Sequence, residues 1–524
     1  MMKAVNLNFD QTGSRVVFSV GLGALVGAGM AFFTPTNFIN SWLAYSVLLI
    51  ISFFGLVSAW HWAGGGKVLA WMVILAFVLR LGVGVATTML LPEYGFDTEQ
   101  QNAGYLFYDA HQRDLQAWEL ASSKQPLWVS FRDEFATDQY GGLLSLSAGV
   151  YRYLSPDEHR PVLILILAAF AASLGVPFLW RVVSERWDHG VANLAAWIYV
   201  LYPDGILFSA SQMREPFLIG LICISFWAVI NLKESTPRMW WVLALTLMAM
   251  GVISSRVTVM VVVVLVVIFW VEKLIPKSET WRKTGWLALA VAGAGLLVLS
   301  WEWLQNASAW DILLTELGSG WVQKVIGEIG EWIRVPFVIV YGIAQPVLPA
   351  AIAYPTLLIW KIIAIARAAG WYLLVPFLFY SLFTVWKVKE KEERRILLWL
   401  MFFVAIWVVI SSVRAGGDQW DNPRYRMIFL PWMALLAAWS ARWAWEHKDI
   451  WLARWLVVEG IFLYYFTNWY FSRYFLLWKR LPFWKNVTRI VVLSAIVLGS
   501  GWLWDFIRWL VSRCSKEKMR EKAD

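Results

Sequence analysis

The stretch KVLAWMVILAFVLRLGVGVATTMLL, residues 67–91, decides the fold class of this chain. Apart from Lys67 at its first position, the stretch carries a single charged side chain, Arg80. About 20 consecutive, mostly apolar residues allow an α-helix to cross the hydrocarbon core of a membrane. We therefore expect 67–91 to be a transmembrane helix.

The composition of the whole chain extends this expectation. Of its 524 residues, 60% are hydrophobic and only 15% are charged, whereas soluble domains carry about 25% charged residues. So little charge cannot cover the surface of a soluble protein of this length. The apolar segments are 16–35, 41–62, 67–91, 160–180, 190–204, 215–231, 239–254, 257–274, 284–301, 368–386, 396–413, 427–445, 452–471 and 488–507. They predict an all-α polytopic membrane protein, a single domain over 1–524 with about 12–14 transmembrane helices.

The distribution of Lys and Arg predicts how this multi-pass chain lies in the cell membrane. Links rich in these residues alternate with poor ones, and the rich links are expected in the cytoplasm. The segments expected outside are an acidic loop at 92–159, an interfacial segment at 302–366 and a flexible loop at 414–426. The segments expected in the cytoplasm are the link at 387–395 and the basic tail at 508–524.

The link between the last two apolar segments does not fit this alternation. It holds Arg473, Lys479, Arg480 and Lys485, although the scheme places it outside. Either one of the flanking helices lies in the membrane interface, or these cations bind lipid phosphate.

Several classes of site find no support in the sequence. The two Cys residues and five scattered His residues offer neither a disulfide framework nor paired ligands for a structural metal. No Walker A loop, nucleotide-binding glycine motif or Ser/His/Asp grouping occurs. The net charge of +9 is explained by cytoplasmic Lys and Arg and by anionic lipid, without nucleic acid. The glycines at 21–29 are expected to pack helices against one another.

The external acidic loop contains the first candidate site, FYDAHQRDLQAWELA, residues 107–121. On a helix, Asp109 and Arg113 share one face because they are four residues apart. The loop holds eleven Asp and Glu residues, Asp114 among them, against four Lys and Arg residues. Carboxylates at an outer membrane surface can supply a general base. The alternative is an amphipathic interfacial helix whose acids are simply solvated.

Three further polar features interrupt apolar segments. Arg214 and Glu215 begin one segment, either as a phosphate-binding pair or as an interfacial ion pair. Arg424 and its neighbours in GGDQWDNPRYRMIFLP, residues 416–431, either require an anionic partner or snorkel to the interface. Arg80 is costly in hydrocarbon and is therefore either functional or paired with a buried acid or carbonyl.

Together these motifs resemble the GT-C class of integral membrane glycosyltransferases, which includes protein O-mannosyltransferases and lipid A aminoarabinose transferases. The resemblance covers about residues 67–445 and lies in the order of its parts. These are Arg80, the external motif Asp109-Ala110-x-x-Arg113-Asp114, the helix entry Asp138-Gln139-Tyr140-Gly141, the pair Arg214-Glu215 and the pair Arg424-Tyr425. Many relatives have Asp-Glu where this chain has Asp109-Ala110, so Asp97 competes for the role of Asp109.

The resemblance implies transfer of a sugar, with inversion, from a polyprenyl-phosphate-linked donor to a glycan, lipid or protein acceptor at the extracytoplasmic face. It implies Asp109 as the general base, with Asp97 and Asp114 as the other catalytic candidates. Arg214, Arg256, Arg424 and Arg426 lie near external span ends in the topology scheme, where the donor phosphate would sit. Supporting roles fall to Arg80, Arg113, Asp138, Tyr140, Glu215 and Tyr425. No cofactor is implied, although some members of the class use a divalent cation.

Three other functions remain open from the sequence alone. An O-antigen-type polysaccharide polymerase or ligase also uses a lipid-linked donor, but a large late external loop with Arg and His would favour it. A transporter would show matching halves with broken helices, and the chain has no internal repeat. A non-catalytic membrane assembly protein would have a similar sequence pattern.

Overall fold

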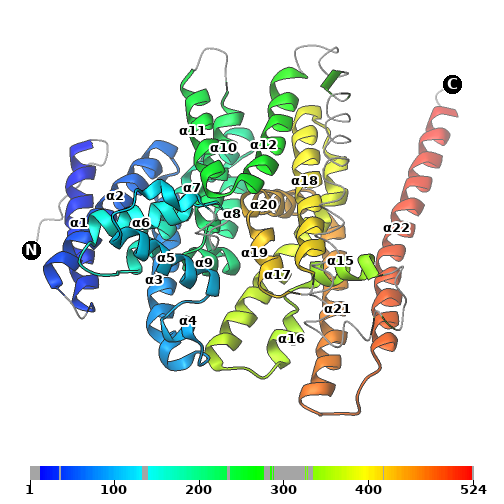
Figure 1. Cartoon of the computed structure of the whole chain (residues 1–524). Coiled ribbons are helices and arrows are strands. Elements are labelled where there is room, and N and C mark those ends of the chain that lie inside the picture. The colour runs from blue at the N-terminus through cyan, green and yellow to red at the C-terminus, as the bar shows by residue number, and fades with distance from the viewer. Residues whose placement is uncertain are drawn as a thin grey trace, which may run out of the picture. The chain divides into compact units, whose positions relative to one another are not determined.

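The computed structural model consists of helices joined by turns and irregular segments, with no strand among the residues that it describes. These residues are 12–34, 37–132, 140–232, 237–275, 284–285, 287, 325, 327, 334–416 and 418–521, with the backbone alone beyond 511. The chain divides into two compact units, 1–345 with 388–438 and 346–387 with 439–524. The all-α architecture expected from the composition is confirmed (Figure 1).

The first unit contains most of the helices. They are α1 (Thr12–Phe32), α2 (Phe38–Ala63), α3 (Gly66–Tyr94), α4 (Glu99–Asn102), α5 (Tyr108–Ser122), α6 (Gly142–Leu154), α7 (Val162–Arg186), α8 (His189–Leu201), α9 (Pro203–Ser209), α10 (Glu215–Ile230), α11 (Pro237–Ile253), α12 (Ser255–Phe269), α15 (Arg334–Ala344), α18 (Lys391–Ala415) and α19 (Asp421–Met427). The second unit contains α16 (Leu348–Ala353), α17 (Leu358–Thr384), α21 (Ile450–Tyr474) and α22 (Phe483–Glu521). The division between the units falls within α20 (Leu430–His447).

Nine helices in the described part of the chain are long and apolar enough to cross a membrane. The bent pairs α8–α9, with an angle of 53°, and α19–α20, with an angle of 73°, raise this number to eleven if each pair is one span. Three shorter apolar helices among the described residues, α10, α11 and α15, have 16, 17 and 11 residues. Every expected apolar segment in the described residues thus forms a helix, whereas most of 284–301 lies outside them. The chain is a polytopic membrane protein.

Two expected boundaries differ clearly from the structure. The segment predicted at 488–507 is part of α22, which extends from Phe483 to Glu521. The segment predicted at 368–386 is part of α17, which begins at Leu358. Lys361, in the first turns of this helix, donates from Nζ to the carbonyl oxygens of Ile352 at 2.7 Å and Tyr354 at 2.5 Å. The helix also contains Arg367, which is buried directly before the predicted start. A search for uncharged segments excludes both cations and therefore places the start of the helix too late. Within the expected interfacial segment 302–366, the described part forms α15, α16 and this first part of α17.

The core of the first unit is built around α7, which packs against α2, α3, α8 and α10. Of its most apolar stretch, 67% is buried. Glycines allow the backbones to approach closely, since a Cβ atom on Gly220 of α10 would overlap the carbonyl group of Ala171. A Cβ atom on Gly27 of α1 would likewise overlap Ser46 of α2. The helix-packing role expected for the glycines at 21–29 is therefore confirmed for Gly27 and for Gly23, which faces Ile50 of α2, whereas a Cβ atom on Gly21 or Gly29 would meet nothing within 4 Å.

Contacts at the two ends of α7 show that the acidic segment 92–159 and the link after α7 lie at opposite ends of the helix. Before α7, Asp157 accepts hydrogen bonds from Asn40 of α2 at 3.0 Å and from Arg160. The Arg160 guanidinium holds the pKa of Asp157 below its usual value. At the other end, Arg181 donates to the carbonyl oxygen of Ala63, the last residue of α2, at 3.2 Å. That the end with Asp157 is extracytoplasmic stays a prediction.

Labelling of single cysteines tests this topology. In a chain with Cys223 and Cys514 replaced by Ser, Glu99→Cys should react with a membrane-impermeant maleimide in intact cells. Glu390→Cys, which is exposed between α17 and α18, should react only after permeabilisation. Equal labelling of both positions from one side of the membrane would contradict the predicted topology.

Candidate functional site

Five charged side chains from three separate segments meet in the first unit. Arg424 of α19 donates from Nε to Glu215 at the start of α10 at 2.7 Å, and from Nη1 to Asp109 in the first turn of α5 at 3.0 Å. The same Nη1 lies 3.5 Å from Asp421, and Arg214 lies 3.8 Å from Glu215. We call Asp109, Arg214, Glu215, Asp421 and Arg424 the Arg424 cluster.

Local sequence signals position the helix ends that carry this cluster. Glu215 begins α10 and Pro216 follows it, which suits the first turn of a helix because proline lacks an amide hydrogen that would go unbonded there. The Asp418 carboxylate accepts from the backbone nitrogens of Trp420 and Asp421 at 2.6 and 2.7 Å, and α19 starts at Asp421. Part of the expected loop 414–426 is therefore a helix held by hydrogen bonds.

Burial divides the cluster into an inner and an outer part. The side chains of Glu215 and Arg424 are only 1% and 9% exposed, whereas that of Asp109 is 53% exposed. A buried ion pair is strongly destabilised when one partner is removed, so Glu215 and Arg424 depend on each other. Asp109 combines contact with a buried cation and exposure to solvent, so its carboxylate is held in place and remains open to a bound molecule.

Hydrogen-bonding capacity remains in the cluster after these contacts are counted. Among the described residues, Arg424 Nη2 makes no hydrogen bond, since only its Nε and Nη1 are used. The guanidinium of Arg214 lies over the ring of Tyr140, 5.3 Å from its centre, and its side chain is 15% exposed. Glu215 Oε2 is buried and has no partner among the described residues. Two arginines thus keep donors for an anion, and one carboxylate oxygen remains for a water or a ligand hydroxyl.

Aromatic side chains border the cluster. Phe107, two residues before Asp109, stacks on Phe208 of α9 with ring centres 5.0 Å apart. Trp420, directly before Asp421, packs edge-on against Phe107 at 5.8 Å. Asp109 and Asp421 therefore both closely follow aromatic residues that pack against each other.

The third catalytic candidate, Asp114, lies in a different environment. Its carboxylate is fully buried and accepts hydrogen bonds from Tyr105 at 2.5 Å and from Tyr151, and it contacts His159 Nε2 at 2.7 Å. Burial, followed by the charge of Asp114, raises the pKa of both tyrosines, so both phenols remain donors. Trp118 stacks on the His159 ring at 5.2 Å. Asp114 therefore fastens α5 to α6 and to the segment before α7.

Removing one of these donors should destabilise the fold. Tyr151→Phe is expected to lower the free energy of unfolding by about 1.5–3 kcal/mol, because it takes a hydrogen bond from a buried carboxylate. Tyr153→Phe on the same helix, where the side chain is 74% exposed, should change it by less than about 0.5 kcal/mol. Denaturation in mixed micelles measures both variants, and equal effects would contradict a structural role for Asp114.

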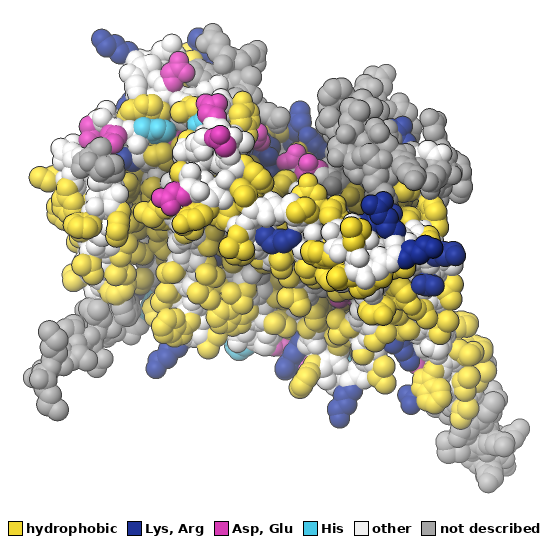
Figure 2. All heavy atoms as spheres, turned by 90° about the horizontal axis from the view of Figure 1, so that it is seen from below, with side chains coloured by type: hydrophobic (Ala, Val, Ile, Leu, Met, Phe, Trp, Pro, Cys, Tyr) yellow, Lys and Arg dark blue, Asp and Glu magenta, His cyan; other side chains and the backbone are white. Residues whose placement is uncertain are grey.

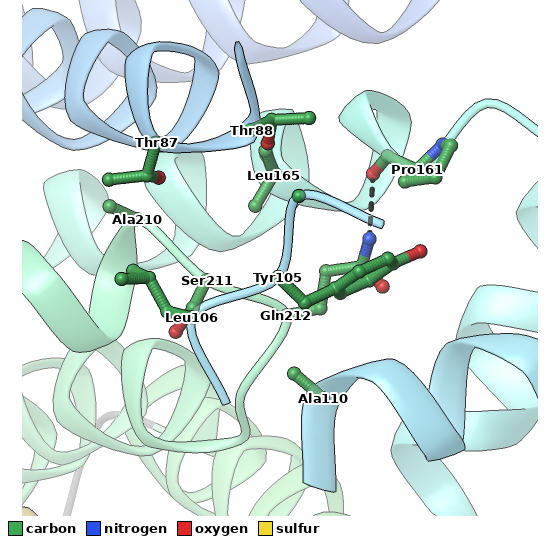
Figure 3. A pocket seen from close by; sticks show the side chains of 11 residues that line it. Thr87, Thr88, Tyr105, Leu106, Ala110, Pro161, Leu165, Ala210, Ser211 and Gln212 are labelled. Atoms are coloured by element: carbon green, nitrogen blue, oxygen red, sulfur yellow. Dashed lines mark hydrogen bonds between the residues drawn. The ribbon is translucent and has the colours of Figure 1, made fainter. Parts of the chain in front are cut away.

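A small cavity lies beside this carboxylate network. It has a volume of about 20 Å³, enough for one water molecule. Thr87 and Thr88 of α3, Tyr105 and Gln212 are among the residues that line it (Figure 3). Gln212 crosses one side and donates to the carbonyl oxygen of Pro161 at 3.0 Å. The cavity is too small for a sugar and belongs to the packing of α3, α5 and α7.

The structure places several other predicted residues in backbone contacts. Arg80 is completely buried and donates to the carbonyl oxygens of Ala76 and Tyr199, both at 3.1 Å. Arg113 donates to the carbonyl oxygen of Gln212 at 3.0 Å. Of the two alternatives for Arg80, these contacts fit the one in which the side chain pairs with buried carbonyl groups.

The remaining arginine and tyrosine predictions, Arg426, Tyr425 and Arg256, are not part of the Arg424 cluster. Arg426 is completely buried and donates to the carbonyl oxygen of Gln345 at 3.0 Å, so we leave it out of the phosphate site proposed below. Tyr425 lies under the guanidinium of Arg414, at 5.0 Å. Arg256 is exposed in the first turn of α12.

Of the two other acids predicted for the site, the structure describes only Asp97. Asp97 is exposed and accepts a hydrogen bond from Asn102 at 2.9 Å. Asp138 lies outside the described residues. No group of three or more His, Cys, Asp or Glu residues in the described part of the chain is arranged to hold a metal ion.

Several residues of these arrangements were not predicted from the sequence. Asp421 could have been found, because a helical residue three positions before Arg424 lies on the same face. Tyr105, Tyr151 and His159 gave no such signal, since they reach Asp114 from separate segments.

The order of motifs and the geometry of the Arg424 cluster therefore carry the functional interpretation of this chain. Comparison with protein-family models finds no match, and comparison with curated protein sequences finds none either.

Proposed function

We propose that this protein is a membrane glycosyltransferase of the GT-C type, which transfers a sugar from a polyprenyl-phosphate-linked donor to an acceptor at the extracytoplasmic face. One observation carries the proposal. The half-exposed carboxylate of Asp109 lies 3.0 Å from the buried guanidinium of Arg424, and Arg214 approaches the same Glu215 that holds Arg424. A base and two cations in one cluster are what sugar transfer from a lipid phosphate requires.

The two arginines supply the donor site in this proposal. Arg424 Nη2 and the guanidinium of Arg214 bind the phosphate, which is also the leaving group. Glu215 and Asp421 are positioning residues, because they contact Arg424 rather than the sugar. Fixed cations at the leaving oxygens stabilise the negative charge that develops there as the sugar departs.

Asp109 takes the acceptor proton. As the acceptor oxygen attacks the anomeric carbon from the face opposite the phosphate, its proton moves to the Asp109 carboxylate. The bond between the anomeric carbon and the phosphate oxygen breaks, and its electron pair leaves with the lipid phosphate. The configuration at the anomeric carbon is thereby inverted. Protonation neutralises Asp109, so Arg424 loses one anionic partner as the phosphate gains charge.

Binding of a donor-like lipid tests the proposal. In nanodiscs, the full chain should retain undecaprenyl phosphate but not undecaprenol, as measured by native mass spectrometry. Arg214→Gln should weaken retention about tenfold or more, since charged hydrogen bonds contribute about 1.5–3 kcal/mol. Arg132→Gln is a matched control, because Arg132 is an exposed arginine that also lies over an aromatic ring, that of Trp128. Equal retention of the phosphate and the alcohol would overturn the donor assignment.

A further inference from the structure

The link between α21 and α22 in the second unit has a defined shape. The two helices run side by side and are joined at the bottom of Figure 1. The backbone nitrogen of Leu481 donates to Ser472 Oγ at 3.3 Å, and the ring of Phe483 packs on Trp469 at 5.6 Å. The link therefore turns back onto the end of α21, and the residues between these contacts are held near it.

Positive charge gathers at this turn without acidic residues to balance it. Arg473, Lys479, Arg480 and Lys485 lie within thirteen positions, and no Asp or Glu occurs anywhere from 460 to 504. Three of these side chains are exposed and Arg473 is partly buried. We call these four residues the link cations.

The acids elsewhere in the second unit already have partners or lie apart from the link. Asp449 pairs with Lys387 at 2.6 Å, and Glu446 pairs with Arg442 at 2.7 Å. Asp505 accepts from the indole nitrogen of Trp451 at 2.6 Å, at the other end of α21. Glu459 lies within α21, fourteen positions before Arg473, and pairs with none of the link cations. The link cations therefore lack an acidic partner among the described residues of this unit.

Arg473 is held in a position suited to an anion. Its guanidinium lies over the ring of Trp469, 4.1 Å from the ring centre, and the charge of Arg480 acts on it repulsively. Its Nε is buried and has no hydrogen-bond partner among the described residues. Like charges that are held together with unused donors are stabilised by an anion between them.

The surroundings of the link cations are apolar and face outwards. Phe475, Leu476, Leu477 and Trp478 are between 40% and 67% exposed. The most apolar stretches of α21 and α22 are only 0% and 6% buried, so both helices present their sides to lipid. In the view from below, dark-blue Lys and Arg side chains lie among yellow hydrophobic ones (Figure 2). Cations at the end of a lipid-facing helix pair, ringed by aromatic residues, match the headgroup level of a membrane.

We propose that the link cations form a binding site for the phosphate headgroup of an anionic membrane phospholipid, with its acyl chains along α21 and α22. Both helices are long enough to cross a membrane, which disfavours the alternative that one of them is interfacial. The predicted topology puts this link outside, where the cytoplasmic preference for Lys and Arg does not explain its charge. The site shares no residue with the Arg424 cluster and does not rest on the proposed enzymatic function.

Lipid retention by variants of the full chain tests this site. In mixed micelles of phosphatidylglycerol and phosphatidylcholine, native mass spectrometry should show selective retention of phosphatidylglycerol. Arg473→Gln with Arg480→Gln should weaken that retention about 30-fold, because each cation near an anionic lipid surface contributes about 1 kcal/mol. Arg473→Lys with Arg480→Lys keeps the charge and should retain most of the binding.

The control removes two cations elsewhere in the second unit. Arg442→Gln with Arg508→Gln should leave retention unchanged, since Arg442 is paired with Glu446 and Arg508 lies over Trp504. Should the Arg473 and Arg480 variant fail to fold, Lys479→Gln with Lys485→Gln changes only exposed side chains and carries the same expectation. Equal retention of both phospholipids, or equal loss in the control, would overturn the site. Preferential retention of undecaprenyl phosphate over phosphatidylglycerol at the link cations would overturn the assignment to a phospholipid.

Discussion

Asp109→Asn is expected to lower the rate of sugar transfer by about 10²–10⁴-fold, the usual contribution of a general base. The amide keeps the shape of the side chain and can still accept a hydrogen bond from Arg424, but it cannot take the acceptor proton at neutral pH. The side chain is 53% exposed, so the fold should persist. The rate is measured with purified protein and a panel of polyprenyl-phosphate-linked sugars, with inversion checked on the product.

Asp97→Asn is the matched control for this variant. Asp97 is an exposed acid of the same segment, and its carboxylate accepts a hydrogen bond from Asn102, so its variant should transfer sugar at the normal rate. Full activity of Asp109→Asn together with loss in Asp97→Asn would move the base to Asp97. Full activity of both variants would show that neither acid is the general base, which would contradict the proposed function.

Arg424→Gln should destabilise the protein by about 3–5 kcal/mol, the cost typical of removing one partner of a buried ion pair. The variant leaves Glu215, which is 1% exposed, as a buried carboxylate without its main partner. Glu215→Gln in the same chain removes that charge and should recover much of the loss. The free energy of unfolding in mixed micelles is measured for both single variants and the double variant.

The exposed pair of Arg442 and Glu446 provides the comparison for this cycle. Both side chains are nearly half exposed, at 45% and 46%, so Arg442→Gln should cost at most about 1 kcal/mol. Additive effects of Arg424→Gln and Glu215→Gln would mean that the two side chains are not energetically coupled. That result would contradict the buried ion pair between Glu215 and Arg424.

The helices of this protein follow from its apolar segments, but their packing does not. Charge-free segments of about 20 residues identify spans because the membrane requires them. The same rule places the start of α17 too late, because the first part of that helix contains Lys361, bonded to the carbonyl oxygens of Ile352 and Tyr354, and the buried Arg367.

Four of the five members of the Arg424 cluster were predicted from the sequence, but Asp421 was not, and neither was the pairing of the side chains. An arginine at an expected external helix end indicates an anionic partner, and for Arg424 the structure supplies Glu215 and Asp109. These partners lie 209 and 315 residues away in the chain, and no local pattern reports contacts over such distances. An acid on an amphipathic helix can be either solvated or buried, so the burial of Asp114 depended on tyrosines and a histidine from other segments.

The position of a bound donor phosphate shows whether the Arg424 cluster is the donor site. A cryo-electron microscopy map of the full chain in nanodiscs with undecaprenyl phosphate would locate the headgroup. We expect phosphate density within hydrogen-bonding distance of Arg424 or Arg214, with the Asp109 carboxylate facing the same space. Bound lipid whose phosphate lies away from both arginines, with no density at the Arg424 cluster, would contradict the assignment of this cluster as the donor site.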